Sequence, residues 1–308
     1  MSGTIRAPLL VLGAAGVIGA GVVQQAIEAG WPVIAVDRDA DGLARLRHRH
    51  PDADLDVLQG SLATDSDGVA VVDALRAMGR PLAGVVATIA GGGTRGRLLD
   101  RPSATLCHQL DQDLIPHLVA ARQLLPLLAQ ADRGASYILI GGPGGSAPWA
   151  GYGHRSVAAA AVHMLASVLH DEARTLGLRL HLLSVDVPVC AEQERIKACP
   201  HWPTAPSIGR RALELIDRDE SIASQPVVHY DRQATLAATT PAANAGHESV
   251  SSYVRHLLAR TLRGERTTAM RATQDPDIAP GQESRRYPPA PPAAESKWLT
   301  FPLREAPP

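Results

Sequence analysis

The chain has 308 residues, of which 45% are hydrophobic, and a formal net charge of −1 at pH 7. This length allows one large α/β domain or two smaller ones, and the near-zero charge argues against a nucleic-acid-binding or membrane-surface protein. Cysteines without paired spacing, at Cys107, Cys190 and Cys199, are typical of a reduced, cytoplasmic protein, and no stretch is long and apolar enough to span a membrane.

Short apolar runs alternate with helical patterns along most of the chain. We expect strands in residues 7–14, 32–37, 54–60, 82–91, 136–142, 178–188 and 225–231. We expect helices in residues 19–30, 41–50, 67–79, 104–130, 156–176 and 207–218. This alternation is typical of parallel strands joined by right-handed crossovers, with helices on both faces of the sheet. The sequence therefore predicts an α/β domain over residues 1–233, with a Rossmann-type, doubly wound parallel sheet.

The composition changes after this domain. Residues 234–308 hold ten of the 24 prolines, with alanine, threonine and serine between them. This composition predicts a mostly irregular, Pro/Ala-rich C-terminal extension. Within it, residues 248–263 have apolar side chains at helical spacing, and Gly264 stands where a helix C-cap belongs. We expect an amphipathic helix that docks either on its own domain or on a partner, and the pattern leaves both alternatives open.

A glycine run follows the first predicted strand. Gly13, Gly16 and Gly19 are spaced as G-x-x-G-x-x-G and lead into a helix. Glycine lets the chain turn sharply and approach a pyrophosphate, which then meets the free N–H groups of the helix start. Asp37 ends the second strand, about twenty residues further on, where a carboxylate binds the adenosine ribose hydroxyls and repels a 2′-phosphate. We therefore predict a dinucleotide cofactor, NAD in preference to NADP, although the neighbouring Arg38 favours NADP.

These residues, in this order, resemble the short-chain dehydrogenase/reductase family over roughly residues 7–232. The resemblance implies a homodimer or homotetramer built on the long helices near residues 104–130 and 156–176. It places Asp113 at the family's structural and catalytic asparagine, and it adds further positions beside the cofactor. The predicted cofactor-binding residues are then Gly13, Gly16, Val17, Ile18, Gly19, Asp37, Arg38, Ser61, Ala90, Gly91 and Cys190.

The family's catalytic residues are absent from the positions that match them. The serine position falls on Gly142. Counted without gaps, the tyrosine position falls on Arg155 and the lysine position on Ala159. In a second register Tyr152 is the tyrosine and Ser156 stands at the lysine, but this register needs extra residues inside a helix. No lysine occurs before residue 197, so neither register has the ammonium group that lowers the tyrosine pKa and binds the nicotinamide ribose.

Tyr152, Arg155 and His154 are the remaining catalytic candidates. A guanidinium lowers the pKa of a nearby phenol electrostatically, and Tyr152 and Arg155 share a helix face if the helix begins early. A histidine titrates near neutral pH, although for His154, and for His163 and His170 further along, a structural role is the simpler interpretation.

The glycine-rich loop over residues 141–153 contains no acid or base. Its Trp149 and Tyr152 cover either an apolar ligand or the core. Ser146 is the hydroxyl nearest to the lost serine. No spacing of cysteine and histidine fits a metal site, so we predict none.

Three functional hypotheses follow. The first is an NAD(H)-binding relative of the family that is degenerate for carbonyl and alcohol hydride transfer and acts in cofactor sensing, scaffolding or a non-redox step on a small molecule. The second is an active NAD-dependent short-chain oxidoreductase that uses Tyr152 with Arg155 or a nearby histidine. The third is a protein-interaction platform that works through the C-terminal extension. We favour the first, because the glycine run and Asp37 are present while the serine, tyrosine and lysine are not.

Overall fold

The computed structural model describes residues 6–92, 95–131, 134–195, 199, 202–217 and 224–231. Within these residues seven parallel strands form one sheet in the order β3-β2-β1-β4-β5-β6-β7. The strands are β1 (Leu9–Leu12), β2 (Val33–Asp37), β3 (Leu55–Gln59), β4 (Gly84–Ala87), β5 (Ser136–Gly141), β6 (Arg179–Ser184) and β7 (Val227–His229). The predicted doubly wound sheet is confirmed. The predicted helix near residues 248–263 lies outside the described residues.

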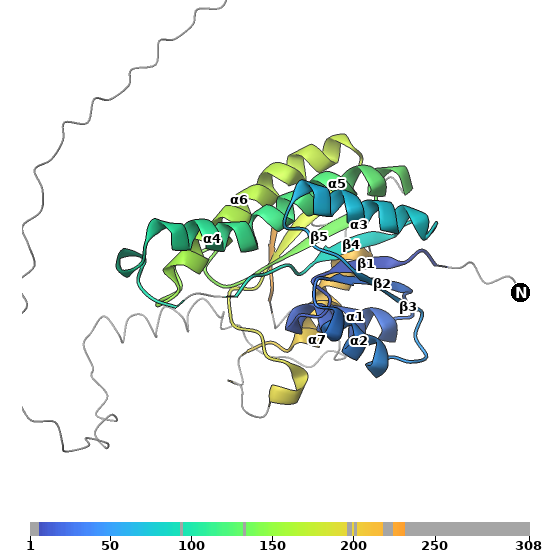
Figure 1. Ribbon diagram of the computed structural model, residues 1–308, viewed down its shortest axis with the longest axis horizontal. Helices are drawn as coiled ribbons and strands as arrows, with labels where there is room; N and C mark the ends of the chain where they lie inside the picture. The colour runs from blue at the N-terminus through green and yellow to red at the C-terminus, as the bar shows by residue number, and fades with distance from the viewer. Residues whose placement is uncertain are drawn as a thin grey trace, which may run out of the picture. The chain divides into compact units, whose positions relative to one another are not determined.

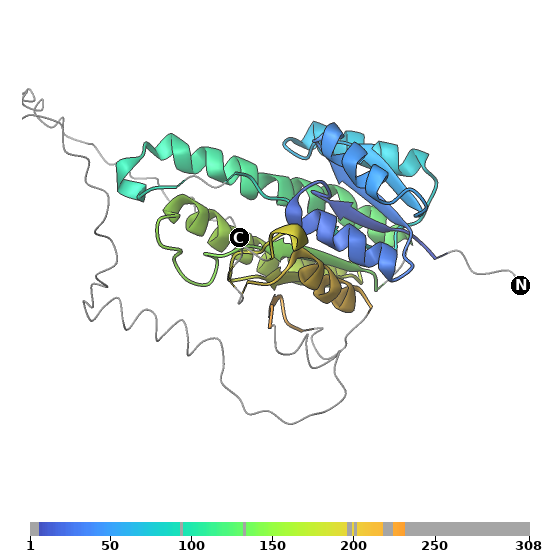
Figure 2. The same ribbon diagram turned by 90° about the horizontal axis from the view of Figure 1, so that it is seen from below.

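Helices cover both faces of the sheet. One face carries α3 (Asp65–Ala77), α5 (Ile115–Ala131) and α6 (Gly153–Thr175), and the other carries α1 (Val17–Glu28), α2 (Ala40–Arg49) and α7 (Ala205–Ile216) (Figure 1). Figure 2 shows the molecule from the side of α1 and α7. Strand β1 has no exposed face, because Leu10 and Leu12 pack into the first layer while Leu9 and Val11 pack into the second. A continuous apolar run is what a strand buried on both faces requires.

Two glycines let α1 and α7 pack closely. A Cβ atom on Gly209 would lie 2.6 Å from the carbonyl oxygen of Gly21, and a Cβ atom on Gly21 would overlap the backbone of Ala205. Neither position has room for a side chain. This contact sets α7 against the helix that follows the glycine turn.

The prediction of a single helix over residues 104–130 is wrong, because the chain forms two helices there, α4 (Ser103–Asp113) and α5. A single residue, Leu114, separates the end of α4 from the start of α5. Pro116 in the first turn of α5 has no N–H group to donate to the preceding turn, so the hydrogen-bond ladder is interrupted. The amide groups of both His117 and Leu118 donate to the carbonyl of Leu114 at this junction, at 3.1 and 3.2 Å.

Helix α6 begins at Gly153, three residues before the predicted start at residue 156. Both views show α4 and the first turns of α6 extending past the sheet (Figures 1 and 2). They project beyond the edge where β5 ends, which is where the glycine-rich loop lies. Two short 3-10 helices, Leu98–Asp100 and Glu192–Glu194, lie in connecting loops. In the described part of the chain, no helix has the length and apolar character needed to cross a membrane.

Candidate functional site

The glycine turn between β1 and α1 is tightly built. Gly13 has a φ of +71°, and a Cβ atom there would lie 2.8 Å from the carbonyl oxygen of Thr88 at the end of β4. A Cβ atom on Gly19 would overlap the Gly13 carbonyl. The Thr88 hydroxyl donates to the carbonyls of Leu12 and Gly13, at 2.8 and 3.0 Å, and fixes the turn to the neighbouring strand.

The start of α1 keeps its amide groups available. Gly16 is the N-cap, and no side chain caps the helix. The N–H groups of the first turn, which include those of Val17 and Ile18, have no acceptor within the helix. Free amides at a helix start, beside glycines that admit close approach, fit the pyrophosphate of a dinucleotide. The residues present therefore fit this group.

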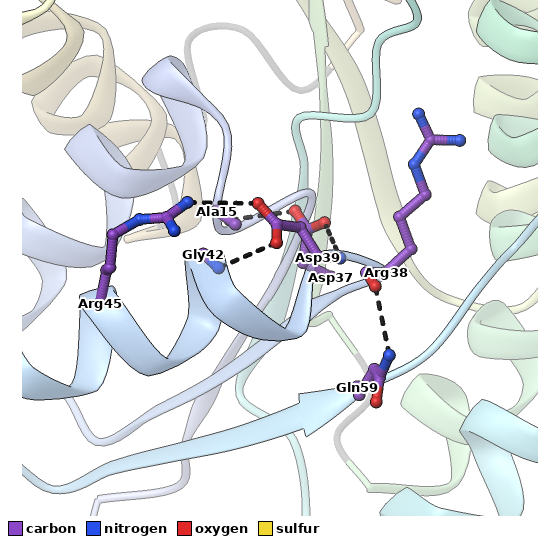
Figure 3. Close-up of polar contacts among 7 residues, drawn as sticks. All are labelled: Ala15, Asp37, Arg38, Asp39, Gly42, Arg45 and Gln59. Atoms are coloured by element: carbon purple, nitrogen blue, oxygen red, sulfur yellow. Dashed lines mark hydrogen bonds and ion pairs between the residues drawn. The ribbon is translucent and has the colours of Figure 1, made fainter.

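Asp37 faces the glycine turn from the end of β2. One carboxylate oxygen accepts a hydrogen bond from the amide of Ala15 at 3.0 Å, and the other accepts one from the amide of Asp39 at 2.9 Å (Figure 3). A carboxylate accepts several hydrogen bonds, so these contacts leave lone pairs for ribose hydroxyls. Its position beside the turn matches that role.

The cations near Asp37 differ in their surroundings. Arg45 lies 3.4 Å from Asp39, which also caps α2 by accepting from the amide of Gly42. Arg38 is exposed, and its side chain extends away from Asp37 and Asp39 (Figure 3). The backbone carbonyl of Arg38 accepts a hydrogen bond from the side chain of Gln59 at 3.4 Å.

The loop after β4 is anchored by α4. The Gly91 amide donates to the carboxylate of Asp113 at 2.6 Å, and Gln109 donates to the other oxygen of that carboxylate at 2.7 Å. A Cβ atom on Gly91 would lie 2.6 Å from the side chain of Gln112. Ala90 precedes this anchored residue. Asp113 thus holds the loop at the carboxyl edge of the sheet, which is a positioning role.

His117 holds the same loop from α5. Its Nε2 lies 3.0 Å from the carbonyl oxygen of Ile89 and donates to it, because a carbonyl only accepts. The imidazole is buried, and its Nδ1 has no hydrogen-bond partner. Burial lowers the pKa of His117 to about 4, although the bond to Ile89 opposes this effect.

Two predicted cofactor positions have other partners. The Ser61 hydroxyl donates to Asp67 at 3.2 Å and accepts from the amide of Ala63 at 3.1 Å, next to the capping box of α3. The Cys190 thiol is buried and lies 3.5 Å from the carbonyl of Pro203. Cys190 therefore ties the loop after β6 to the start of α7.

At the positions that match the family's tyrosine and serine, Arg155 lies beside Gly142. Its guanidinium would be 3.8 Å from a Cβ atom built on Gly142. This proximity matches the ungapped register, in which these residues stand at the family's tyrosine and serine positions. The same guanidinium lies 5.9 Å from the centre of the Trp149 ring.

The predicted pair of Tyr152 with Arg155 is not formed, because Tyr152 precedes the first residue of α6 and contacts Arg95 instead. Arg95 donates a hydrogen bond to the Tyr152 hydroxyl. Tyr152 also stacks on Trp149, with ring centres 4.1 Å apart. Each ring of the aromatic pair therefore has a guanidinium group nearby, Arg95 at 5.4 Å from the centre of the Tyr152 ring and Arg155 at 5.9 Å from that of Trp149. Sequence reasoning missed Arg95, which no local pattern marks.

His154 is buried in the first turn of α6, and its Nδ1 has no hydrogen-bond partner. Among the described residues, no hydrogen bond joins this imidazole to the Tyr152 hydroxyl or to the Arg155 guanidinium. Among the described residues, no group of three or more His, Cys, Asp or Glu side chains is placed to hold a metal ion.

The family model described as short chain dehydrogenase matches residues 8–187. No curated protein matches the chain in sequence. Many solved structures share its fold. A short-chain type dehydrogenase/reductase from Mycobacterium ulcerans superposes with a TM-score of 0.66 at 19% identity, covering 86% of this chain and 99% of the other.

Two structures from Pseudomonas aeruginosa are similar as well. An active-site complex of RhlG with NADP has a TM-score of 0.65 at 18% identity, covering 74% of this chain and 96% of the other. The second is a short chain oxidoreductase described as containing an atypical catalytic center. Its ligand-free structure has a TM-score of 0.62 at 20% identity, covering 72% of this chain and 94% of the other.

Proposed function

Because the chain belongs to the short-chain dehydrogenase family, we propose that it binds NAD(H) at the carboxyl edge of β1 and β2 and is degenerate for the family's usual hydride transfer. The proposed loss of hydride transfer rests on one observation, the proximity of Arg155 to Gly142. A bound nicotinamide supplies hydride transfer, but these two positions provide neither the hydroxyl nor the phenol that handle the substrate proton in the family. The protein then senses the cofactor, acts as a scaffold or carries out a non-redox step.

The preference for NAD over NADP rests on charge. Asp37 presents a carboxylate to the place where the adenosine ribose binds, and a 2′-phosphate there would be repelled. Arg38, the cation next to it, extends away from this carboxylate (Figure 3). The NADP complex of RhlG shows that a protein of this fold accepts the phosphorylated cofactor. The cofactor preference of this chain therefore depends on whether repulsion of the 2′-phosphate by Asp37 outweighs its attraction to Arg38.

A calorimetric titration tests the proposal. We expect the purified chain to bind NADH, and to bind NADPH at least about ten-fold more weakly, which corresponds to about 1.4 kcal/mol. Equal affinities would contradict the role of Asp37, and binding of neither would contradict cofactor binding altogether. Prolonged incubation of the NADH complex with a panel of small aldehydes and ketones should leave the absorbance of NADH unchanged.

The contact between Arg95 and Tyr152 favours a second candidate function, an active oxidoreductase with an unusual centre. The guanidinium contacts the phenol oxygen directly, and one similar structure is itself described as having an atypical catalytic center. Turnover with any carbonyl substrate that Tyr152→Phe abolishes would favour this candidate over the first. Tyr230→Phe is the matched control, since its hydroxyl bonds Ser207 in the first turn of α7.

The small-molecule ligand of either function would be an anion with a planar group. Arg95 lies near the Tyr152 ring and Arg155 near the stacked Trp149 ring, and within the described residues no ion pair joins either arginine to a carboxylate. Guanidinium groups bind carboxylates and phosphates in two-pronged geometry.

Helix α6 supports a proposed homodimer or homotetramer. Val157, Met164 and Val168 are 40%, 66% and 48% exposed and follow helical spacing along one stripe. Leu118 on the neighbouring α5 is 42% exposed. A stripe of this kind on two packed helices is suited to a second copy of the chain.

The three free cysteines agree with a proposed cytoplasmic location. The proposed third role, an interaction platform in the C-terminal extension, concerns residues outside those described.

A further inference from the structure

A connected set of polar side chains lies at the carboxyl ends of β6 and β7. Ser184 ends β6, Asp186 follows it, and His229 ends β7 directly beside Ser184 in the strand register. His163 reaches them from α6, and Ser146 reaches them from the glycine-rich loop. The set therefore joins four separate segments, and the function proposed above uses none of its members.

The carboxylate of Asp186 is the centre of this set. It accepts a hydrogen bond from the Ser184 hydroxyl at 3.0 Å, from the Ser146 hydroxyl at 3.3 Å and from Nδ1 of His229 at 3.0 Å. Because an ionised carboxylate only accepts, the proton positions follow: both serines and Nδ1 of His229 carry the bridging protons. Ser184 then accepts from Nε2 of His163, which lies 3.3 Å away.

His229 has one nitrogen left for another molecule. With Nδ1 protonated toward Asp186, the neutral imidazole keeps a lone pair on Nε2. The His229 side chain is 60% exposed, so the ring is open to solvent. His163 is the other imidazole nearby. Burial lowers the pKa of His163, while Asp186 raises it and His229 lowers it further. His163 is therefore uncharged at neutral pH. It bonds Ser184, whereas His229 bonds Asp186.

The set lies directly against the loop of the lost catalytic centre. The His163 ring occupies the space beside Gly145, where a Cβ atom would overlap it, and Nε2 would be 3.5 Å from a Cβ atom on Gly141. Gly142, at the family's serine position, lies between these two glycines. The amide of Val185 also donates to the carbonyl of Gly141 at 3.0 Å.

We propose that His229 and Asp186 form a proton-transfer pair that acts on a small molecule carrying a hydroxyl group or another acidic proton, bound against residues 141–146. The substrate proton passes to Nε2 of His229, and the electron pair of the broken bond stays on the substrate. Asp186 is a positioning residue that orients the imidazole and stabilises the imidazolium that forms. Two Asp186 contacts, from Ser146 and Ser184, hold the carboxylate in place. This pair goes beyond the proposed function, which uses neither His229 nor Asp186.

A proton-abstraction probe tests the pair directly. Nitrobenzisoxazole loses its ring C–H proton to a base, the N–O bond breaks, and a coloured cyanophenolate forms, so no second reactant is needed. We expect the wild-type chain to catalyse this elimination and His229→Gln to reduce the rate at least about ten-fold, since a positioned general base contributes 10²–10⁴-fold. His108→Gln should leave the rate unchanged, because that imidazole is on α4 and bonds Gln112.

Asp186→Asn separates positioning from folding. We expect it to lower the elimination rate as well, and to change the nitrogen NMR signature of His229 from the Nδ1–H to the Nε2–H tautomer, while circular dichroism stays unchanged. Equal rates in the wild type and in His229→Gln, or an unchanged tautomer in Asp186→Asn, would overturn the proposal. The assay contains no dinucleotide, so its failure is distinguishable from failure of NADH binding.

Discussion

Asp37 connects three parts of the nucleotide site through a single side chain. Its carboxylate accepts from the glycine turn at Ala15 and from the start of the next connection at Asp39. In the proposed cofactor complex the same oxygens bind the ribose hydroxyls. Loss of the charge at this position would act on the proposed cofactor contact. An asparagine there would also leave one of these two backbone amides without an acceptor, because a carboxamide has only one accepting oxygen.

We expect Asp37→Asn to weaken NADH binding by about ten-fold and to weaken NADPH binding less, because the amide no longer repels a 2′-phosphate. Calorimetric titration with both cofactors measures the change. Asp73→Asn is the control, since Asp73 pairs with Arg76 on the exposed side of α3. An unchanged ratio of the two affinities would remove Asp37 from cofactor selection.

The sequence predicted some of these residues and missed others for a physical reason. Gly13 and Asp37 belong to one strand–helix–strand unit, so their spacing along the chain encodes their contact. Arg95 and Tyr152 are 57 residues apart, and Asp186 and His229 are 43 apart. Contacts of this kind depend on which strands are neighbours in the sheet, and no short motif records that order.

At the level of secondary structure, α1 and α7 form the closest helix contact described above. Gly21 and Gly209 face each other there, and the backbone of one helix fills the space where a side chain of the other would be. The helix boundaries themselves were predicted less well. Periodicity continues smoothly through residues 104–130, so only the missing N–H group of Pro116 marks the break at Leu114.

We expect Gly21→Ala to lower the free energy of unfolding by about 1–3 kcal/mol, because the added methyl group overlaps the backbone of Ala205. The better helix propensity of alanine, worth about 1 kcal/mol, offsets only part of this cost. Urea denaturation measures the difference. Gly92→Ala should be neutral, since a Cβ atom there has no neighbour within 4 Å. A stabilised Gly21→Ala chain would contradict the tight packing.

At the scale of the whole molecule, buried histidines couple folding to pH. The pKa of His117 is lowered from 6.5 to about 4 by burial, and burial lowers the pKa of His163 and His181 as well. At a pH between the folded-state pKa and the unfolded-state pKa of such a histidine, the histidine is protonated in the unfolded chain and neutral in the folded chain. The free energy of unfolding therefore falls as the pH falls through this window.

We expect His117 alone to remove up to about 3 kcal/mol of stability between pH 6.5 and pH 4. In His117→Gln the side-chain amide can still donate to Ile89, so the loss over this range should be smaller. Thermal denaturation at several pH values measures both slopes. His48→Gln, at an exposed position on α2, should keep the wild-type slope. Identical slopes in all three chains would exclude His117 as the source.

The assembly is also a property of the whole molecule. We expect Met164→Glu to dissociate the proposed oligomer into monomers, because a charge would be buried in the apolar stripe of α6. Sedimentation velocity measures the mass. Val69→Glu, on the exposed side of α3, should leave the mass unchanged. A wild-type chain that sediments as a monomer would contradict the interface.

The strand order has a consequence for synthesis on the ribosome. Strand β1 is made first but lies near the middle of the sheet, between β2 and β4. Its partner on one side, β2, emerges soon after it, whereas β4 begins only at Gly84. Until then one row of backbone amides and carbonyls on β1 has no partner in the sheet. Such an open edge is a template for wrong pairing, and the nascent chain is most in need of a chaperone during this interval.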